Sequence, residues 1–254
     1  MNHLNSSIDE NLVEVRNGEA ATSIVIVCEH ASAFIPAEFG NLGLPVEALK
    51  SHVVWDPGAH GVAVAMAAHL DATLVASKTS RLVYDCNRPP EAPDAMPDRS
   101  EVYDIPGNAG LSDVQRAERV ARFYEPFRAG VAGVMAAKVA PVLVTVHSFT
   151  PVYHGARRDV EIGVLHDADS RLADALIETA GGHLTRNVQR NAPYGPEDGV
   201  THTLREHALP QGHLNVMLEV RNDLIADVPA EARMADALSG WVSAALARVE
   251  AAAC

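Results

Sequence analysis

Aromatic residues are scarce in this sequence of 254 residues, where Phe, Tyr and Trp together account for only 5%. Ala and Val are abundant instead, and a hydrophobic fraction of 48% is enough to fill one large core of closely packed helices on a sheet. Cysteine is also scarce: Cys28, Cys86 and Cys254 form no metal-binding CxxC pattern. An odd number of cysteines without such a pattern is typical of the reducing cytoplasm, which is the location we expect.

Positive charge and long apolar runs are lacking as well. The net charge is −13, and no clustered basic stripe is present, so we expect neither nucleic acid nor an anionic membrane as a partner. No apolar run reaches the length that spans a bilayer, and the polar start MNHLNSSIDENLVE does not resemble a signal peptide. We therefore expect the protein to bind a small molecule, as a monomer or a small homo-oligomer.

Strands and helices are predicted in alternation along the chain. No linker, low-complexity tract or internal repeat divides it, so we expect a polar tail over residues 1–20 and a single domain over 21–254. Apolar runs of the buried-strand kind cover 22–28, 72–78, 141–147, 160–166 and 213–220, with a shorter one at 81–87. Helices are predicted over 59–70, 113–138, 170–182 and 229–252. This order predicts an α/β fold with helices on both faces of the sheet.

Two features interrupt this pattern. The segment 113–138 begins at Ser112 or Asp113 as the helix N-cap, and Pro126 predicts a kink because proline removes a backbone donor. The loop from Pro89 to Gly110 is too long for a plain connection, so we expect it to line or cover a site.

Two histidines leave predicted strands at their carboxyl ends. His30 follows the strand at 22–28, and His147 ends the strand at 141–147. Ligands of α/β proteins bind at this edge of the sheet, so the two imidazoles can share one cation. Neutral imidazole suits Zn²⁺, and a catalytic zinc site takes three protein ligands and keeps one position open.

The third ligand should be a nearby carboxylate. Asp56 is the main candidate and Glu29 the alternative. Asp56 also fits a purely structural role, because Asp-Pro-Gly before a helix is a capping pattern, and the sequence leaves these two roles open. His60, in the helix that follows, is expected on the helix surface.

Glu219 lies at the end of the strand at 213–220, where a buried carboxylate needs a partner. One interpretation is a salt bridge to Arg221, which shares its side of the strand. The other makes Glu219 a general base that deprotonates a water molecule activated by zinc.

Arginines cluster near the same strand ends. Arg81 and Arg88 lie close to Asn87 in TSRLVYDCNRPP, and Arg221 comes from another strand. Any one of them suits an ordinary surface position. Together, in an acidic protein, they predict a site for a small carboxylic acid, because a guanidinium group binds a carboxylate through two hydrogen bonds.

Six motifs between Ser23 and Asp223 resemble those of the N-formylglutamate amidohydrolase family: VCEHAS, VVWDPGAHG, TSRLVYDCNRPP, VTVHSF, NAPYGPEDG and VMLEVRND. TSRLVYDCNRPP is the most specific, being close to the family pattern SR…D-x-NRP. The resemblance implies a zinc hydrolase related to metallocarboxypeptidases. It implies a three-layer α/β/α sandwich of the phosphorylase/hydrolase-like type around a mostly parallel mixed sheet.

The same resemblance implies roles for individual residues. His30, Asp56 and His147 match the metal ligands, and Glu219 matches the base that activates water. Asn87 and Arg88 match the pair that holds the substrate carboxylate, while Arg81 and Arg221 also fall on family motifs. The expected reaction is hydrolysis of N-formyl-L-glutamate to formate and L-glutamate, in amino-acid degradation, with one Zn²⁺ as cofactor.

The turn around His30 departs from the family. Better-known members have proline and serine beside this histidine and glycine just after it, whereas this chain reads Glu29, His30, Ala31, Ser32. The departure keeps Glu29 as an alternative ligand and points to a divergent branch. Two further alternatives are a carboxypeptidase-like deacylase of another N-acyl amino acid and a non-catalytic, metal-dependent carboxylate-binding protein.

Overall fold

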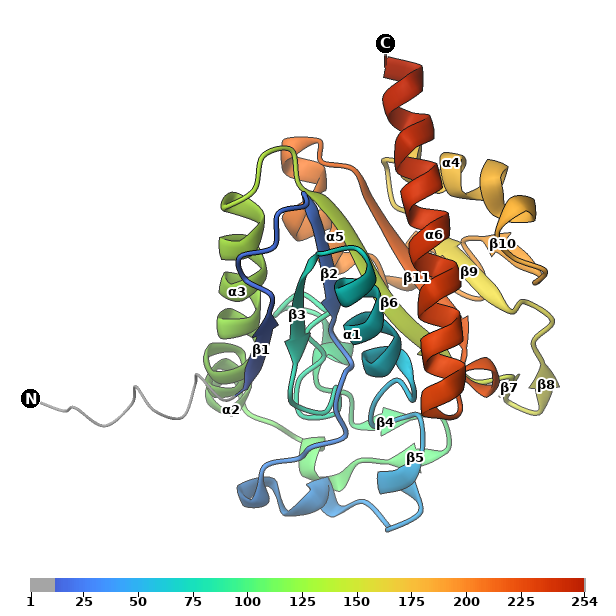
Figure 1. Cartoon of the computed structure of the whole chain (residues 1–254). Helices are drawn as coiled ribbons and strands as arrows, with labels where there is room; N and C mark the ends of the chain where they lie inside the picture. The colour runs from blue at the N-terminus through green and yellow to red at the C-terminus, as the bar shows by residue number, and fades with distance from the viewer. Residues whose placement is uncertain (1–11, 254) are drawn as a thin grey trace, which may run out of the picture.

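A seven-stranded sheet forms the centre of the protein, as a computed structural model that describes residues 12–253 shows (Figure 1). The strand order is β1-β3-β2-β6-β11-β9-β10. The strands are β1 (Val13–Arg16), β2 (Ile24–Cys28), β3 (Thr73–Ser77), β6 (Val142–Phe149), β9 (Ile162–Leu165), β10 (Val188–Arg190) and β11 (Asn215–Arg221).

The sheet is mixed and mostly parallel. β3, β2, β6 and β11 run in one direction, while β1 is antiparallel to β3 and β9 is antiparallel to β11. The four parallel strands therefore have their carboxyl ends at one edge of the sheet, where α/β folds bind ligands.

Helices cover both faces. α1 (Ala59–His69), α4 (Arg171–Thr179) and α6 (Val228–Ala253) pack together on one face, and α3 (Glu125–Ala136) and α5 (His202–His207) contact the other. The three-layer α/β/α architecture inferred from the sequence is confirmed. No helix in the described part of the chain is both long and apolar enough to cross a bilayer.

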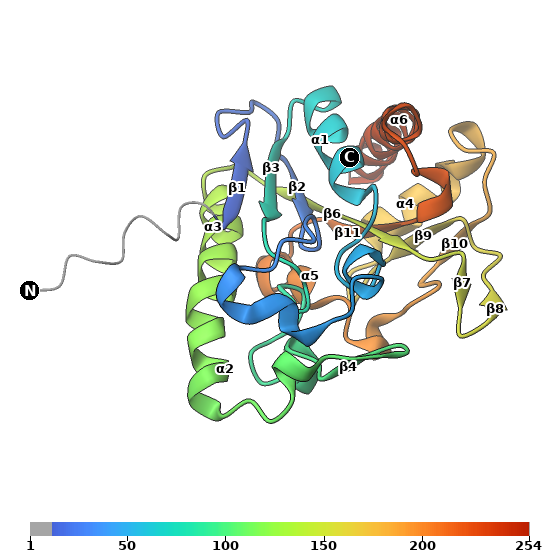
Figure 2. The ribbon, with the colours of Figure 1, turned by 90° about the horizontal axis from the view of Figure 1, so that it is seen from below.

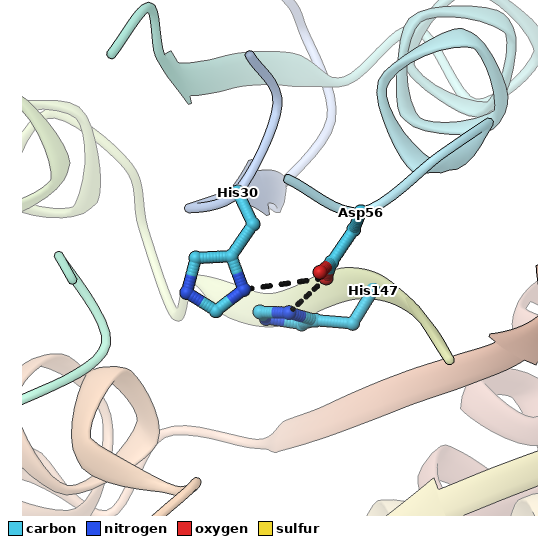
Figure 3. A group of neighbouring side chains, drawn as sticks. All are labelled: His30, Asp56 and His147. Atoms are coloured by element: carbon cyan, nitrogen blue, oxygen red, sulfur yellow. Dashed lines mark hydrogen bonds and ion pairs between the residues drawn. The ribbon is translucent and has the colours of Figure 1, made fainter. Parts of the chain in front are cut away.

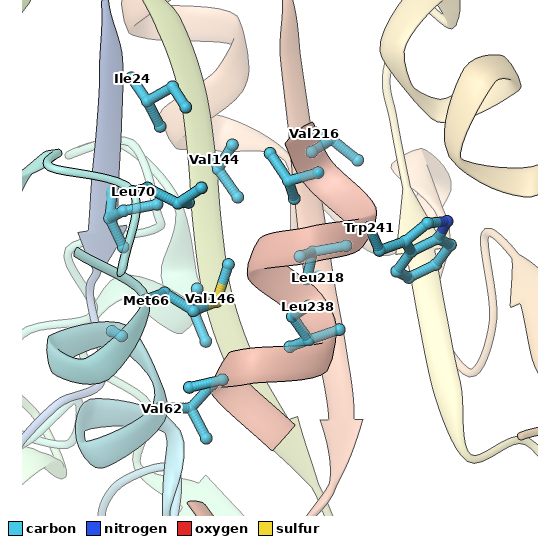
Figure 4. Close-up of a cluster of buried hydrophobic side chains, with 14 of the residues drawn as sticks. Ile24, Val62, Met66, Leu70, Val144, Val146, Val216, Leu218, Leu238 and Trp241 are labelled. Carbon is cyan, nitrogen blue, oxygen red and sulfur yellow. The ribbon is translucent and has the colours of Figure 1, made fainter. Parts of the chain in front are cut away.

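Alternation along the two central strands separates core from site. Val146 and Leu218 point into the core beneath α1 and α6 (Figure 4). Successive side chains of a strand point to opposite faces, so His147 and Glu219 face the other side of the sheet. The two are direct neighbours across the β6–β11 ladder.

The sheet begins earlier than the sequence indicated. Residues 13–16, within the predicted polar tail, form β1 and pair with β3. Its sequence VEVR alternates apolar and polar residues, which suits an edge strand with one solvated face. Residues 1–11 of the predicted tail lie outside the described residues.

The strand suggested at 81–87 is a series of turns instead. The hydroxyl of Ser80 accepts a hydrogen bond from the Leu82 amide at 3.2 Å, and its carbonyl accepts one from the Val83 amide at 2.9 Å. Asp85 accepts from the Asn87 amide through its side chain at 2.9 Å. These local acceptors take the donors that a strand would need, which is how Ser and Asp favour turns.

The predicted helix 113–138 is divided into α2 (Asp113–Arg119), a π-helical turn at Val120–Tyr124, and α3. Ser112 is the N-cap and forms a capping box with Gln115. Pro126 lies in the first turn of α3, where its missing N–H needs no partner. The break therefore comes just before the proline.

Two hairpins extend the carboxyl edge of the sheet. One consists of β4 (Arg99–Ser100) and β5 (Tyr103–Asp104), within the long loop that we expected to line a site. The other consists of β7 (Val152–Tyr153) and β8 (Ala156–Arg157), directly after β6. Figure 2 looks at the molecule from this end, with β4 in the lower part of the view and β7–β8 at its right.

Candidate active site

A cavity of about 400 Å³ opens at the carboxyl edge of the parallel strands. His30, Asp56, His147 and Glu219 lie at its base. The β4–β5 hairpin and Tyr153 of β7 line its mouth, so the Pro89–Gly110 loop does contribute to the site. The predicted histidines, from two strands far apart in sequence, thus meet in one place.

Asp56 connects the two histidines. Its Oδ2 lies 3.3 Å from Nδ1 of His30 and 2.9 Å from Nδ1 of His147 (Figure 3). The same oxygen accepts from the Ser148 amide at 3.3 Å, and Oδ1 accepts from Arg81 at 3.2 Å. The capping alternative does not hold, because α1 starts after Gly58 without any side-chain cap.

The far nitrogen of each imidazole faces a second carboxylate. Nε2 of His30 lies 2.7 Å from Oδ1 of Asp85, and Nε2 of His147 lies 3.0 Å from Oε2 of Glu29. Carboxylates only accept, so each Nε2 would carry the proton if Nδ1, which is directed at Asp56, held a metal ion. This is the arrangement in which a carboxylate fixes the tautomer of a metal-binding histidine.

Electrostatics at the base favours a cation. Burial by itself would lower the pKa of His147, but the Glu29 and Asp56 carboxylates raise it well above its usual value. Burial would raise the pKa of Asp56, but His30, His147 and Arg81 hold it far below its usual range. The site therefore keeps the Asp56 carboxylate ionised and favours positive charge beside it.

The residues present fit a metal ion. His30, Asp56 and His147 are buried, and one ligand atom from each lies within 4.8 Å of the others. Two imidazole nitrogens and one carboxylate oxygen form a donor set that binds Zn²⁺ and leaves a position open. Glu29 faces Nε2 of His147, whereas Asp56 faces Nδ1, so Glu29 does not lie where the third ligand of this cluster would be.

Glu219 is next to this cluster and has no salt bridge to Arg221. It is 5% exposed, it lines the cavity, and its Oε2 accepts no hydrogen bond from a described residue. Burial raises its pKa to about 7, with a further contribution from the Asp56 charge against the opposing effect of His147. A carboxylate with this pKa takes up and releases a proton near neutral pH.

A glycine on the neighbouring strand makes room for Glu219. Gly163 of β9 is its partner in the sheet, and a Cβ there would lie 3.1 Å from the Cβ of Glu219 and 2.1 Å from the carbonyl oxygen of Ala192. Any larger residue would push the backbone away.

Arg81, Asn87 and Arg88 all line the cavity, as predicted. Arg81 donates to Asp85 at 3.0 Å besides Asp56. The Asn87 amide group is bonded on both sides, to the Val200 carbonyl and the Thr203 amide.

Arg88 keeps part of its binding capacity. It donates through Nε to Asp94 at 2.6 Å and through Nη1 to the carbonyls of Asn87 and Gly199, both at 3.0 Å. No described residue accepts a hydrogen bond from its Nη2.

Arg221 is not brought to the cavity. Its Nε donates to Asp223 at 2.8 Å, and Nη1 donates to the carbonyl of Arg158 at 3.1 Å. Its side chain is 7% exposed and lies within 3.5 Å of Glu161. It therefore fastens the segment after β8 to the end of β11.

Several residues of the site were not predicted from the sequence. Asp85 belongs to the D-x-NRP pattern, which was the signal for it, but no role was assigned. Tyr194 comes from NAPYGPEDG and lines the cavity, and burial raises its pKa to about 12. His52 and Glu101 pair at 2.6 Å at the mouth, and nothing in the local sequence indicated this contact.

Comparisons with known proteins identify the fold and the family. The crystal structure of gene product Atu2144 from Agrobacterium tumefaciens superposes with a TM-score of 0.92 at 54% identity, over 94% of this chain and 96% of that one. The N-formylglutamate amidohydrolase from Ralstonia eutropha JMP134 has the same fold, with a TM-score of 0.55 at 17% identity over 94% and 97% of the two chains. No match is found among curated proteins. The sequence profile described as N-formylglutamate amidohydrolase matches residues 22–226, and the chain therefore belongs to the N-formylglutamate amidohydrolase family.

Proposed function

We propose that this protein is a zinc-dependent amidohydrolase that cleaves the amide of an N-formyl amino acid with an acidic side chain. N-formyl-L-glutamate, giving formate and L-glutamate, is the first substrate to test. The observation that carries the proposal is the position of Glu219, a buried carboxylate with a pKa of about 7 in the same cavity as the His30, Asp56 and His147 cluster.

The three clustered side chains would hold the metal. A divalent cation there would supply Lewis acidity, polarising the amide carbonyl and lowering the pKa of water. His30 and His147 are oriented for this by the Asp85 and Glu29 carboxylates.

Glu219 moves the proton. As a carboxylate it removes a proton from the attacking water, and as a carboxylic acid it returns that proton to the departing nitrogen. Its free Oε2 and its burial keep it available for this, since no other group of the described chain competes for the oxygen.

Arg88 binds the α-carboxylate of the substrate through its free Nη2. Asp94 and two backbone carbonyls fix its guanidinium plane before substrate arrives. Asn87, with both ends of its amide already bonded, contributes by holding the segment around Val200 and Thr203 in place. A preorganised anchor of this kind places the amide over the base of the cavity.

The test is formate release from N-formyl-L-glutamate by zinc-loaded and chelator-stripped protein. We expect release by the loaded protein, loss of release on stripping, and recovery when zinc is returned. Glu219→Gln serves as control, since it should bind zinc and release no formate. Equal release with and without metal would disprove the metal-dependent mechanism.

A deacylase acting on larger acyl groups is the second candidate. It is favoured by the Glu29-His30 departure from the family. N-acetyl-L-glutamate in the same assay distinguishes the two, with acetate as the product to detect.

A further inference from the structure

The arginines that line the cavity already have acidic partners. The pairs are Arg81 with Asp56 and Asp85, Arg88 with Asp94, and Arg99 with Asp104. A substrate with two carboxylates needs a second cationic anchor besides Arg88. The lining arginines therefore offer little uncompensated positive charge for it.

Arg158 is different. It follows β8, and no carboxylate of the described chain forms an ion pair with it. Its guanidinium lies over three aromatic rings, 4.4 Å from the centroid of Tyr153, 4.9 Å from Tyr194 and 5.5 Å from Phe149. All three rings line the cavity, and the guanidinium packs against them, although Arg158 is not itself among the lining residues.

The hydrogen bonds of Arg158 leave donors free. Nη1 donates to the Thr150 carbonyl at 3.3 Å and Nη2 to the Tyr194 hydroxyl at 2.9 Å. A guanidinium group has five N–H donors, so three have no acceptor among the described residues. Thr150 also lines the cavity, which brings another contact of this arginine to the same wall.

The backbone of Arg158 is fixed on both sides. Its amide donates to the Pro151 carbonyl at 2.9 Å, and its carbonyl accepts from Arg221 at 3.1 Å. Arg221 is buried at the end of β11, so it connects the segment that carries Arg158 to the strand that carries Glu219. A backbone that is fixed in this way reduces the conformational entropy that is lost when the side chain binds a ligand.

We infer that Arg158 is the specificity residue that binds the side-chain carboxylate of the substrate, with Arg221 as its positioning residue. The inference rests on the proposed function, which assigns the other carboxylate to Arg88. A planar guanidinium with free donors binds a carboxylate through two hydrogen bonds. The cavity then favours N-acyl derivatives of acidic amino acids over their neutral counterparts.

The experiment compares N-formyl-L-glutamate with N-formyl-L-glutamine, which has nearly the same shape without the charge. In Arg158→Met, which keeps a long side chain, we expect kcat/KM for the glutamate substrate to fall about 10–100-fold, mainly through KM. The glutamine substrate should change less than about threefold. Arg157→Ala removes an exposed arginine of β8 beside it and should change neither value.

Arg221→Lys tests the positioning role. Lysine cannot reproduce the guanidinium bonds, so KM for the glutamate substrate should rise while its kcat and both constants for the glutamine substrate stay close to wild type. A merely structural role would affect both substrates alike.

Equal losses on both substrates in Arg158→Met, or no loss on either, would overturn the inference. Calorimetry of L-glutamate and L-glutamine binding separates it from the proposed function. If the wild type hydrolyses neither substrate, the proposed function fails. The role of Arg158 in binding the side-chain carboxylate would still be supported if the wild type binds glutamate better than glutamine and Arg158→Met loses this preference. Glutamate bound no better than glutamine would refute it.

Discussion

At the base of the cavity, His147 and Glu219 come from adjacent central strands and are 2% and 5% exposed. At its mouth, Glu101 lies in the turn of the β4–β5 hairpin and Tyr153 lies in β7, and both are partly exposed. Base residues contact each other through buried carboxylates, whereas mouth residues rely on rings, backbone carbonyls and partly exposed ion pairs.

This difference between base and mouth suggests that the base carries out the reaction and the mouth selects the substrate. Charges at the base interact in a dry environment, so each one shifts the protonation of its neighbours strongly. Charges at the mouth are screened by water, and their loss should change affinity more than reaction rate. Substitutions at the base should therefore have large effects and those at the mouth smaller ones.

Glu219→Gln should have the largest effect. Glutamine keeps the shape but cannot accept the proton, so we expect kcat to fall about 10²–10⁴-fold while the metal stays bound. Kinetics together with metal analysis of the purified variant checks this. Metal lost from the variant would instead make Glu219 a ligand.

The pH profile should follow the same residue. Burial raises the pKa of Glu219 from its ordinary value of 4.5 to about 7, and a bound cation would lower it again. The base acts when deprotonated, so kcat/KM should fall as the pH drops, with an apparent pKa between these two values. An acidic limb above pH 7, or none down to pH 4.5, would contradict this assignment.

Glu29→Gln should reduce metal affinity. Its carboxylate faces Nε2 of His147 at 3.0 Å, and such partners of a ligating histidine typically contribute about 10–100-fold in metal affinity. Competition with a zinc indicator measures the change. Activity at saturating zinc should be largely recovered, which distinguishes this variant from Glu219→Gln; unchanged affinity would mean that Glu29 does not orient His147.

Arg88→Lys should have an intermediate effect. Lysine has the charge but cannot bond Asp94, two carbonyls and a substrate carboxylate at once, so we expect KM to rise about tenfold with kcat nearly unchanged. Steady-state kinetics with N-formyl-L-glutamate gives both constants. A fall in kcat alone would place Arg88 in the chemical step.

His52→Gln should have the smallest effect. It breaks the 2.6 Å contact with Glu101 that links the β4–β5 turn to the loop before Asp56. Partly exposed pairs contribute about 0.2–1 kcal/mol, so thermal unfolding and KM should change only slightly. A large loss of kcat would show that the mouth takes part in the chemistry and would remove the distinction between the two regions.

Sequence patterns were sufficient to predict the α/β class, the order of most strands and helices, and His30, Asp56, His147 and Glu219 at the base of the cavity. His30, His147 and Glu219 lie at or next to the ends of apolar runs. They could be predicted because strand periodicity and strand ends are local properties of the sequence. The sequence does not distinguish a helix cap from a metal ligand at Asp56, because an Asp-Pro-Gly segment before a helix is compatible with either role.

The contacts between distant segments could not be predicted from local patterns. In the folded chain, Asp85 and Glu29 lie behind the two histidines, Arg221 points away from the cavity, and Arg158 packs against rings that line it. These contacts join segments far apart in sequence, and they depend on strand order and hairpin position, which no local pattern specifies. A side chain's partners are set by packing in three dimensions, whereas periodicity shows only which face of its own element the side chain occupies.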